Sequence, residues 1–253
     1  NQNQPLTFQQ KTRYVRSPEA INTDARESNS ALKPTATGCC SGGATTGIIR
    51  WRSVLPDLPT LPVALRVHLA HATVEAIAAD AGADVLHIKG PATDPALRPK
   101  GHTSTDADVL VRPSHLDRLF AGLLRHGWQE VKPLTSGGLV QHSSNWFHGE
   151  LGQLDVHVRF PGIQIAPERA FDVLWRGRES HEIAHRPCTV PSITAQRLIL
   201  LLHAARRLPH HQDDVKVGWT QASPETKAEV MALARELDAE VALSVVTGNL
   251  QDF

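Results

Sequence analysis

The stretch that decides the fold runs from Asp84 to Arg112 and reads DVLHIKG (84–90), PATDPALRPKGHTST (91–105) and DADVLVR (106–112). Two short apolar runs, partly β-branched, flank a segment rich in Pro, Thr and Gly. Short apolar runs bounded by such residues are typical of β-strands, so the pattern predicts two strands joined by a loop. Side chains alternate between the faces of a strand, and we therefore expect Asp106 and Asp108 to share one face.

Two carboxylates on one face predict a bound cation. Like charges repel at short range, and a cation between them relieves the repulsion. Hard oxygen ligands favour Mg²⁺ or Mn²⁺. Asp106 and Asp108 are therefore candidate metal ligands. A structural interpretation stays open, in which Asp106 caps the start of the strand and Asp108 is a solvated edge residue.

A further strand is predicted over residues 153–160, which read QLDVHVRF. Its alternation places Asp155, His157 and Arg159 on one face and apolar residues on the other. A polar face opposite an apolar face indicates that one side of the strand lines a cleft. Asp155 and Arg159 could instead form a cross-strand pair at the surface.

These segments, in this order, resemble the active-site signature of the nucleotidyltransferase (DNA polymerase beta-like) superfamily. The pattern is similar to that of a bacterial nucleotidyltransferase-like family with KG, then R, then DxDLLV, then vDlHwr. It stands here as Lys89-Gly90, Arg98, Asp106-Ala107-Asp108 and Leu154–Phe160, within a resemblance that covers roughly residues 61–219. Two departures stand out: most superfamily members have Gly-Ser where Lys89-Gly90 stands, and the loop from Arg98 to Asp106 is longer than usual.

The resemblance implies an α/β fold, with a small mixed sheet flanked by helices and a helical C-terminal region. It implies a metal-dependent enzyme that transfers NMP from an NTP, with ATP as the leading choice, to a hydroxyl or similar acceptor. That acceptor could belong to a small molecule, a peptide, a protein or an RNA. The alternative is a non-catalytic binding protein of the same fold, acting in peptide recognition or as a toxin–antitoxin partner. The intact Asp-x-Asp favours the enzyme, and the missing Gly-Ser favours the binding protein.

Residue roles follow from the same resemblance. Catalysis and binding of Mg²⁺ or Mn²⁺ are assigned to Asp106, Asp108 and Asp155. Nucleotide and phosphate contacts are assigned to Lys89, Gly90, Arg98, His157 and Arg159. Lysine offers a point charge to phosphate oxygens, and glycine allows close approach of the backbone. His157 or Arg159 could orient the acceptor or pyrophosphate.

The chain divides into three predicted parts. Residues 1–50 are rich in Gln, Asn, Thr, Ser and Pro, which is typical of a flexible extension. Residues 51–165 form the predicted α/β core, and residues 166–253 form a mostly helical region. Helical spacing of apolar residues, with caps and breakers, predicts helices over 62–81, 115–126, 167–175, 192–208 and 224–237. Pro113-Ser114 is the expected cap of the second of these helices, and Leu124 is among its residues expected to point inward. His68 and His71 are expected on the outer face of the first helix, and one strand is expected within 181–190.

Composition narrows the class of protein further. The 26 basic and 26 acidic residues balance, so there is no broad electrostatic case for nucleic-acid binding. No apolar run is long enough for a membrane span and no signal peptide is visible, while three cysteines without a disulfide framework favour a reducing cytoplasm.

Three smaller features leave alternatives open. The adjacent residues Cys39 and Cys40 either lie in a flexible linker or form a thiol site, a metal site or part of a peptide substrate. The fourteen histidines lack HExxH or Cys/His spacing, so no zinc site is predicted. The His210–Asp214 segment is an exposed helix end or a contact for the acceptor or ribose.

Overall fold

The computed structural model describes residues 61–248, except 100, 102, 135–141 and 209–210. The predicted flexible extension (residues 1–50) and the Cys39-Cys40 pair lie outside the described residues. The described residues belong to one unit that spans 56–253. Within them, no helix is both long and apolar enough to cross a membrane.

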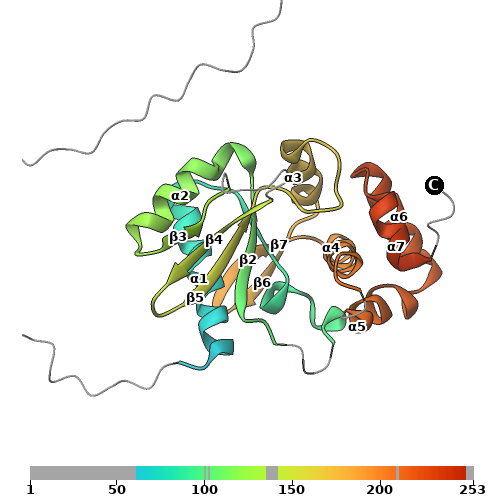
Figure 1. Cartoon of the computed structure of the whole chain (residues 1–253), viewed down its shortest axis with the longest axis horizontal. Coiled ribbons are helices and arrows are strands. Elements are labelled where there is room, and N and C mark those ends of the chain that lie inside the picture. The colour runs from blue at the N-terminus through green and yellow to red at the C-terminus, as the bar shows by residue number, and fades with distance from the viewer. Residues whose placement is uncertain (1–60, 100, 102, 135–141, 209–210, 249–253) are drawn as a thin grey trace, which may run out of the picture. The chain divides into compact units, whose positions relative to one another are not determined.

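Helices and strands alternate along the first part of the described chain, and helices dominate the last part (Figure 1). The helices are α1 (Val63–Ala81), α2 (Leu116–Arg125), α3 (Pro167–Arg176), α4 (Ile193–Ala205), α5 (Gln212–Val215), α6 (Pro224–Glu236) and α7 (Glu240–Thr247). The strands are β1 (Val85–Ile88), β2 (Asp106–Val111), β3 (Gln129–Lys132), β4 (Ser143–His148), β5 (Gly152–His157), β6 (Glu179–Ile183) and β7 (Arg186–Val190).

Five strands form one mixed sheet in the order β1-β2-β5-β4-β3. β2 and β5 run parallel, and the other neighbouring pairs are antiparallel. The predicted α/β class with a small mixed sheet is confirmed. The strand expected within 181–190 is present as β7, and the structure adds β6 before it, because Ala184 and His185 adopt positive φ angles and reverse the chain into a hairpin.

Alternation along the strands places one hydrophobic core on each face of the sheet. Val85, Val109 and Val156 contact α1 and α2 in the first core. Leu86, Ile88 and Leu110 point to the other face, where the second core takes in α3, α4, α6 and α7. Figure 1 shows α4, α6 and α7 grouped together on one side of the sheet. The second core contains residues from both sides of position 165. The division of the chain into an α/β core and a helical region at that position stays a prediction.

Local signals explain most helix ends. Gly82 takes a left-handed φ of 63° and ends α1, and Ser192 Oγ accepts a hydrogen bond from the N–H of Ala195 to start α4. The expected cap at Ser114 was wrong. Its N–H and hydroxyl both donate to Glu168, and α2 begins only at Leu116, after a short helical turn.

Two burial predictions were also wrong. Leu124, expected to point inward, is 60% exposed, because it follows buried Leu123 and is turned about 100° around the helix from it. His71, expected on the outer face of α1, is 0% exposed. Its ring lies against His87 of β1, with 2.8 Å between the two Nδ1 atoms, so His71 belongs to the face of α1 that packs against the sheet.

Candidate active site

The arrangement of β1, β2 and β5 brings residues from distant parts of the sequence together. β2 lies between β1 and β5, so that Asp108 is the register partner of Ile88 on one side and of Asp155 on the other. Asp106, Asp108 and Asp155 line one pocket of about 280 Å³. Leu154 and Val156 lie in the core on the opposite face, as the alternation predicts.

Asp108 is the most enclosed of the three carboxylates, at 3% exposure. The Lys89 ammonium donates a hydrogen bond to its Oδ1, and His157 Nε2 donates to the same oxygen over 2.8 Å. Burial alone would raise the pKa of Asp108, but the positive charge of Lys89 and the hydrogen bond from His157 hold that pKa far below its usual range. Asp108 is therefore ionised at neutral pH.

Asp155 has the opposite electrostatic environment. Burial raises its pKa, the negative charge of Asp108 raises it further, and a hydrogen bond donated by the Asn145 amide offsets only part of this. The two carboxylates thus repel each other, as two adjacent acids do when no cation separates them. Asp155 gains a proton more readily than an ordinary aspartate.

A metal could be held by Asp108, Asp155 and His157. Their potential ligand atoms all lie within 4.8 Å of one another. Asp106 lines the same pocket but is not a member of this group, and its carboxylate is near the hydroxyl of Ser104 at 3.4 Å. The three aspartates remain the predicted ligands, and His157 is a donor that the structure adds to them.

The Lys89-Gly90 step has an unusual backbone. Lys89 has φ 61° and ψ 179°, a region that is essentially restricted to glycine. At Gly90, a Cβ would lie 2.9 Å from the Cβ of Ser104 and 3.0 Å from its hydroxyl. Ser104, from the long loop, thus occupies the space that a serine at position 90 would need.

Arg98 lines the pocket of the carboxylates, whereas Arg159 does not. The guanidinium of Arg98 donates to the backbone carbonyls of Thr93 and Pro91 over 2.7 and 3.2 Å, so it braces the loop while lining the pocket. Arg159 lines another pocket, with Phe160 and other residues, and is not brought to the carboxylates. The phosphate and acceptor roles assigned to these two residues stay predictions.

The end of α4 supplies two pocket residues that sequence reasoning did not assign to the site, and the following segment supplies two more, for which a contact with the acceptor or ribose was one of the two open interpretations. His203 and Arg207 line the pocket together with His211 and Asp214. His211 Nδ1 lies 2.8 Å from Asp214 Oδ2. Burial, together with the nearby charge of Lys89, lowers the pKa of His203 to about 3, so its ring is neutral at pH 7. Their four-residue spacing near the end of a predicted helix could have indicated from the sequence that His203 and Arg207 lie on one face of that helix.

The mixed sheet, its flanking helices and the carboxylates on adjacent strands define a nucleotidyltransferase-like protein. A family model described as "Uncharacterised nucleotidyltransferase" matches residues 63–252. The match covers well over half of the chain, and the chain belongs to this family. No curated protein matches it.

Solved structures with a similar arrangement share little sequence with this chain. The solution structure of the antibiotic-resistance factor ANT(2'')-Ia is 17% identical, with a TM-score of 0.42, over 76% of this chain and 94% of that one. The lincosamide antibiotic adenylyltransferase LnuA, lincomycin-bound, is 18% identical, with a TM-score of 0.42, over 61% and 96%. An antigenic nucleotidyltransferase-like protein from Paracoccidioides brasiliensis is 15% identical, with a TM-score of 0.44, over 71% and 93%.

Proposed function

We propose that this chain is a metal-dependent nucleotidyltransferase that transfers NMP from an NTP, with ATP as the leading choice, to a hydroxyl or similar nucleophile. The observation that carries the proposal is the pairing of Asp108 and Asp155 across parallel strands in one pocket. Their mutual repulsion, which raises the pKa of Asp155 on top of the effect of burial, is what a divalent cation would relieve. The acceptor could be a small molecule, a peptide, a protein or an RNA.

The donor set suits Mg²⁺ or Mn²⁺. The oxygens of Asp106, Asp108 and Asp155 are hard ligands, and His157 adds one nitrogen, which Mn²⁺ tolerates better than Mg²⁺. When bound, such an ion neutralises charge on the triphosphate. The protein's own contribution is to hold Asp108 ionised and Asp155 close beside it.

Lys89 and Ser104 are the proposed phosphate contacts. Lys89 already neutralises Asp108, and a triphosphate would offer the ammonium a more highly charged partner in the same pocket. Ser104 brings a hydroxyl to the place that a serine at position 90 would occupy, so the long loop compensates for the missing Gly-Ser. Arg207 adds a further positive charge to the wall of the pocket.

The acceptor side of the pocket is proposed to involve Asp155, His203 and His211. Asp155 lines the pocket beside Asp108, where its carboxylate could accept the proton of an attacking hydroxyl. Neutral His203 can accept a hydrogen bond from that hydroxyl and orient it. His211 is held in place by Asp214.

One observation favours the second candidate, a non-catalytic binding protein. The Lys89 ammonium lies against Asp108, where an enzyme would place a cation. A permanent ion pair there would leave a nucleotidyltransferase-like pocket that binds a ligand, such as a peptide or a toxin–antitoxin partner, without turnover.

A mass-spectrometric search for NMP adducts separates the two candidates. The protein is incubated with Mg²⁺, a cell lysate as the source of acceptors, and each of the four NTPs in turn. The enzyme is expected to release pyrophosphate and leave one class of adduct, and Asp108→Asn is expected to leave none. Ligand binding without adducts or pyrophosphate from any nucleotide would support the binding protein and refute the enzyme.

A further inference from the structure

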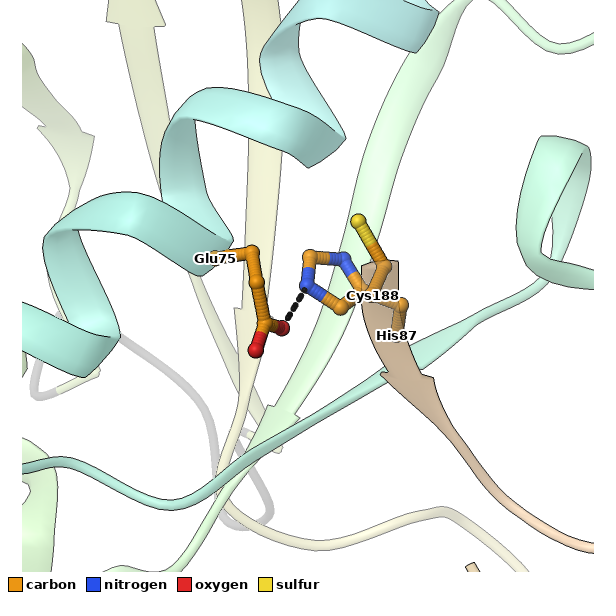
Figure 2. Close-up of side chains that lie close together, drawn as sticks. All are labelled: Glu75, His87 and Cys188. Atoms are coloured by element: carbon orange, nitrogen blue, oxygen red, sulfur yellow. Dashed lines mark hydrogen bonds and ion pairs between the residues drawn. The ribbon is translucent and has the colours of Figure 1, made fainter. Parts of the chain in front are cut away.

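Three side chains converge on the face of the sheet opposite the aspartate pocket. His87 lies on the α1 side of β1, whereas its neighbour Ile88 and the paired Asp108 face the other side. Glu75 comes from α1 and Cys188 from β7, and Figure 2 shows the Glu75 carboxylate pointing to the His87 ring, with Cys188 beside that ring. One donor atom from each of the three lies within 4.8 Å of the others. The sheet separates this cluster from the predicted catalytic residues.

The cluster is buried and its members are held in orientation. His87 and Cys188 are fully buried, and the Glu75 side chain is 17% exposed. His87 Nε2 donates to Glu75 Oε2 over 2.9 Å, while the N–H and the hydroxyl of Thr189 both donate to the same carboxylate at 3.3 Å. The two bonds from Thr189 are outer hydrogen bonds of the kind that orients metal ligands in proteins, whereas the bond between His87 and Glu75 would give way to the metal.

His71 lies one turn before Glu75 in α1 and contacts the other side of the His87 ring. Its Nδ1 lies 2.8 Å from Nδ1 of His87, and its buried Nε2 has no hydrogen-bond partner among the residues that the structure describes. Burial, with the neighbouring His87, lowers the pKa of His71, so its ring is neutral. Each imidazole can carry its proton on either ring nitrogen, and in one tautomer His87 presents a bare nitrogen to Glu75 and Cys188.

We propose that Glu75, His87 and Cys188 form a zinc site that ties α1, β1 and β7 together. Sulfur, imidazole nitrogen and carboxylate oxygen are the donors that Zn²⁺ prefers. A thiolate and a carboxylate also balance the two positive charges. Bond lengths of about 2.0–2.3 Å place tetrahedral donors roughly 3.3–3.8 Å apart, so the cluster needs only a small adjustment. Three protein donors leave the fourth tetrahedral position of the zinc ion for a water molecule. The site is closest to solvent at Glu75, whose side chain is partly exposed.

Zinc binding at this site exchanges one proton for the metal. Without metal, burial and the charge of Glu75 raise the pKa of the Cys188 thiol to about 12. Zinc displaces that proton to solvent, so affinity rises with pH. His87 then bonds the metal through Nε2, carries its proton on Nδ1, and donates it to Nδ1 of His71. Since β1 leads directly into Lys89, zinc would also steady the strand that presents Lys89 to the pocket.

Cobalt substitution tests the site through its sulfur ligand. Full-length protein with Cys39→Ser and Cys40→Ser is the parent, because these changes remove the other two thiols. Metal-free parent is titrated with Co²⁺, and we expect one equivalent to give the near-ultraviolet thiolate-to-cobalt charge-transfer band, which Zn²⁺ then abolishes. Cys188→Ser should lose the band, and Asp108→Asn should keep it. Absence of the band in the parent, or its survival in Cys188→Ser, would overturn the proposal.

Glu75→Gln provides a second test that does not depend on how well Cys188→Ser folds. Glu75 is partly exposed, and glutamine keeps its shape. We expect the charge-transfer band to remain while Co²⁺ affinity falls by at least about tenfold, the scale on which even outer-shell partners act. Zn²⁺ should also raise the melting temperature of the parent more than that of Glu75→Gln. Equal affinity in the parent and the variant contradicts the site.

Discussion

At the scale of single residues, Lys89 combines backbone strain with a partly buried ion pair. A non-glycine residue in its conformation costs on the order of 1–3 kcal/mol, and such strain persists only where the surroundings enforce it. The side chain of the strained residue is held by the carboxylate of Asp108. Strained residues gather at functional sites, which is consistent with the proposed phosphate contact of Lys89.

Lys89→Ala is expected to weaken nucleotide affinity by about 1.5–3 kcal/mol, the scale of a charge-assisted hydrogen bond. Lys89→Arg should recover only part of the lost affinity, because the planar guanidinium group of arginine does not replace the compact ammonium group of lysine. Calorimetric titration with nucleotide and Mg²⁺ measures both. Lys132→Ala, at an exposed position in β3 outside the pocket, is the matched control. Unchanged affinity in Lys89→Ala would remove Lys89 from the site.

Asp108 links the site to the pH dependence of stability. Its pKa is depressed in the folded state, so its ionised form stabilises the protein above the unfolded pKa, and this contribution is lost as pH falls through the folded pKa. Asp108→Asn should therefore melt at a lower temperature than wild type at pH 7. The difference should shrink progressively below about pH 4, the ordinary aspartate range. A constant gap in melting temperature across that range would contradict the ion pair. Catalytic turnover, measured in parallel, should be abolished while the fold stays intact.

At the scale of elements, the loop between β1 and β2 forms one wall of the pocket. Its geometry depends on Gly90, which takes a φ of 49° and leaves room for Ser104. Arg98 bonds the carbonyls of the same loop and limits its movement. The end of α4 forms the facing wall with His203 and Arg207.

Gly90→Ala should destabilise the protein more than Gly101→Ala. Both positions have positive φ, which costs an L-residue roughly 1–2 kcal/mol. Only at Gly90 does the new Cβ also collide with Ser104, because nothing lies within 4 Å of a Cβ at Gly101. Denaturant unfolding measures the difference, and Ser104→Gly added to Gly90→Ala should remove most of it. Equal losses at the two glycines would show that Ser104 moves aside without cost.

At the scale of the whole molecule, one sheet carries two cores and two candidate sites. The aspartate pocket lies on the α4 side and the Glu75–His87–Cys188 cluster on the α1 side. The described residues supply both cores from their own side chains. Their stability should therefore not depend on the polar N-terminal residues.

Deletion of residues 1–50 is expected to lower the melting temperature only slightly. Their composition offers few large apolar side chains for burial. Thermal unfolding of the shortened and full-length chains is the measurement. Leu198→Ala, at a fully buried position in α4, is the control for sensitivity and should cost about 2–5 kcal/mol. A large drop on deletion would make the N-terminal residues an integral layer of the fold.

The sequence by itself determined the features that depend on neighbouring residues. Period-two alternation identified the strands at 106–111 and 152–157 and the faces of Asp108 and Asp155, and helical spacing with caps identified α1, α4 and α6. The ordered motifs also identified the family. These signals are local, because backbone propensity and side-chain direction depend on residues a few positions apart.

Only the tertiary structure decided which distant residues meet. Strand order placed Asp155 beside Asp108, and a loop placed Ser104 against Gly90. The β6–β7 hairpin packed against α1 and brought Cys188 to Glu75 and His87. No local pattern encodes these contacts, since they arise when several elements pack at once and bury their apolar faces together.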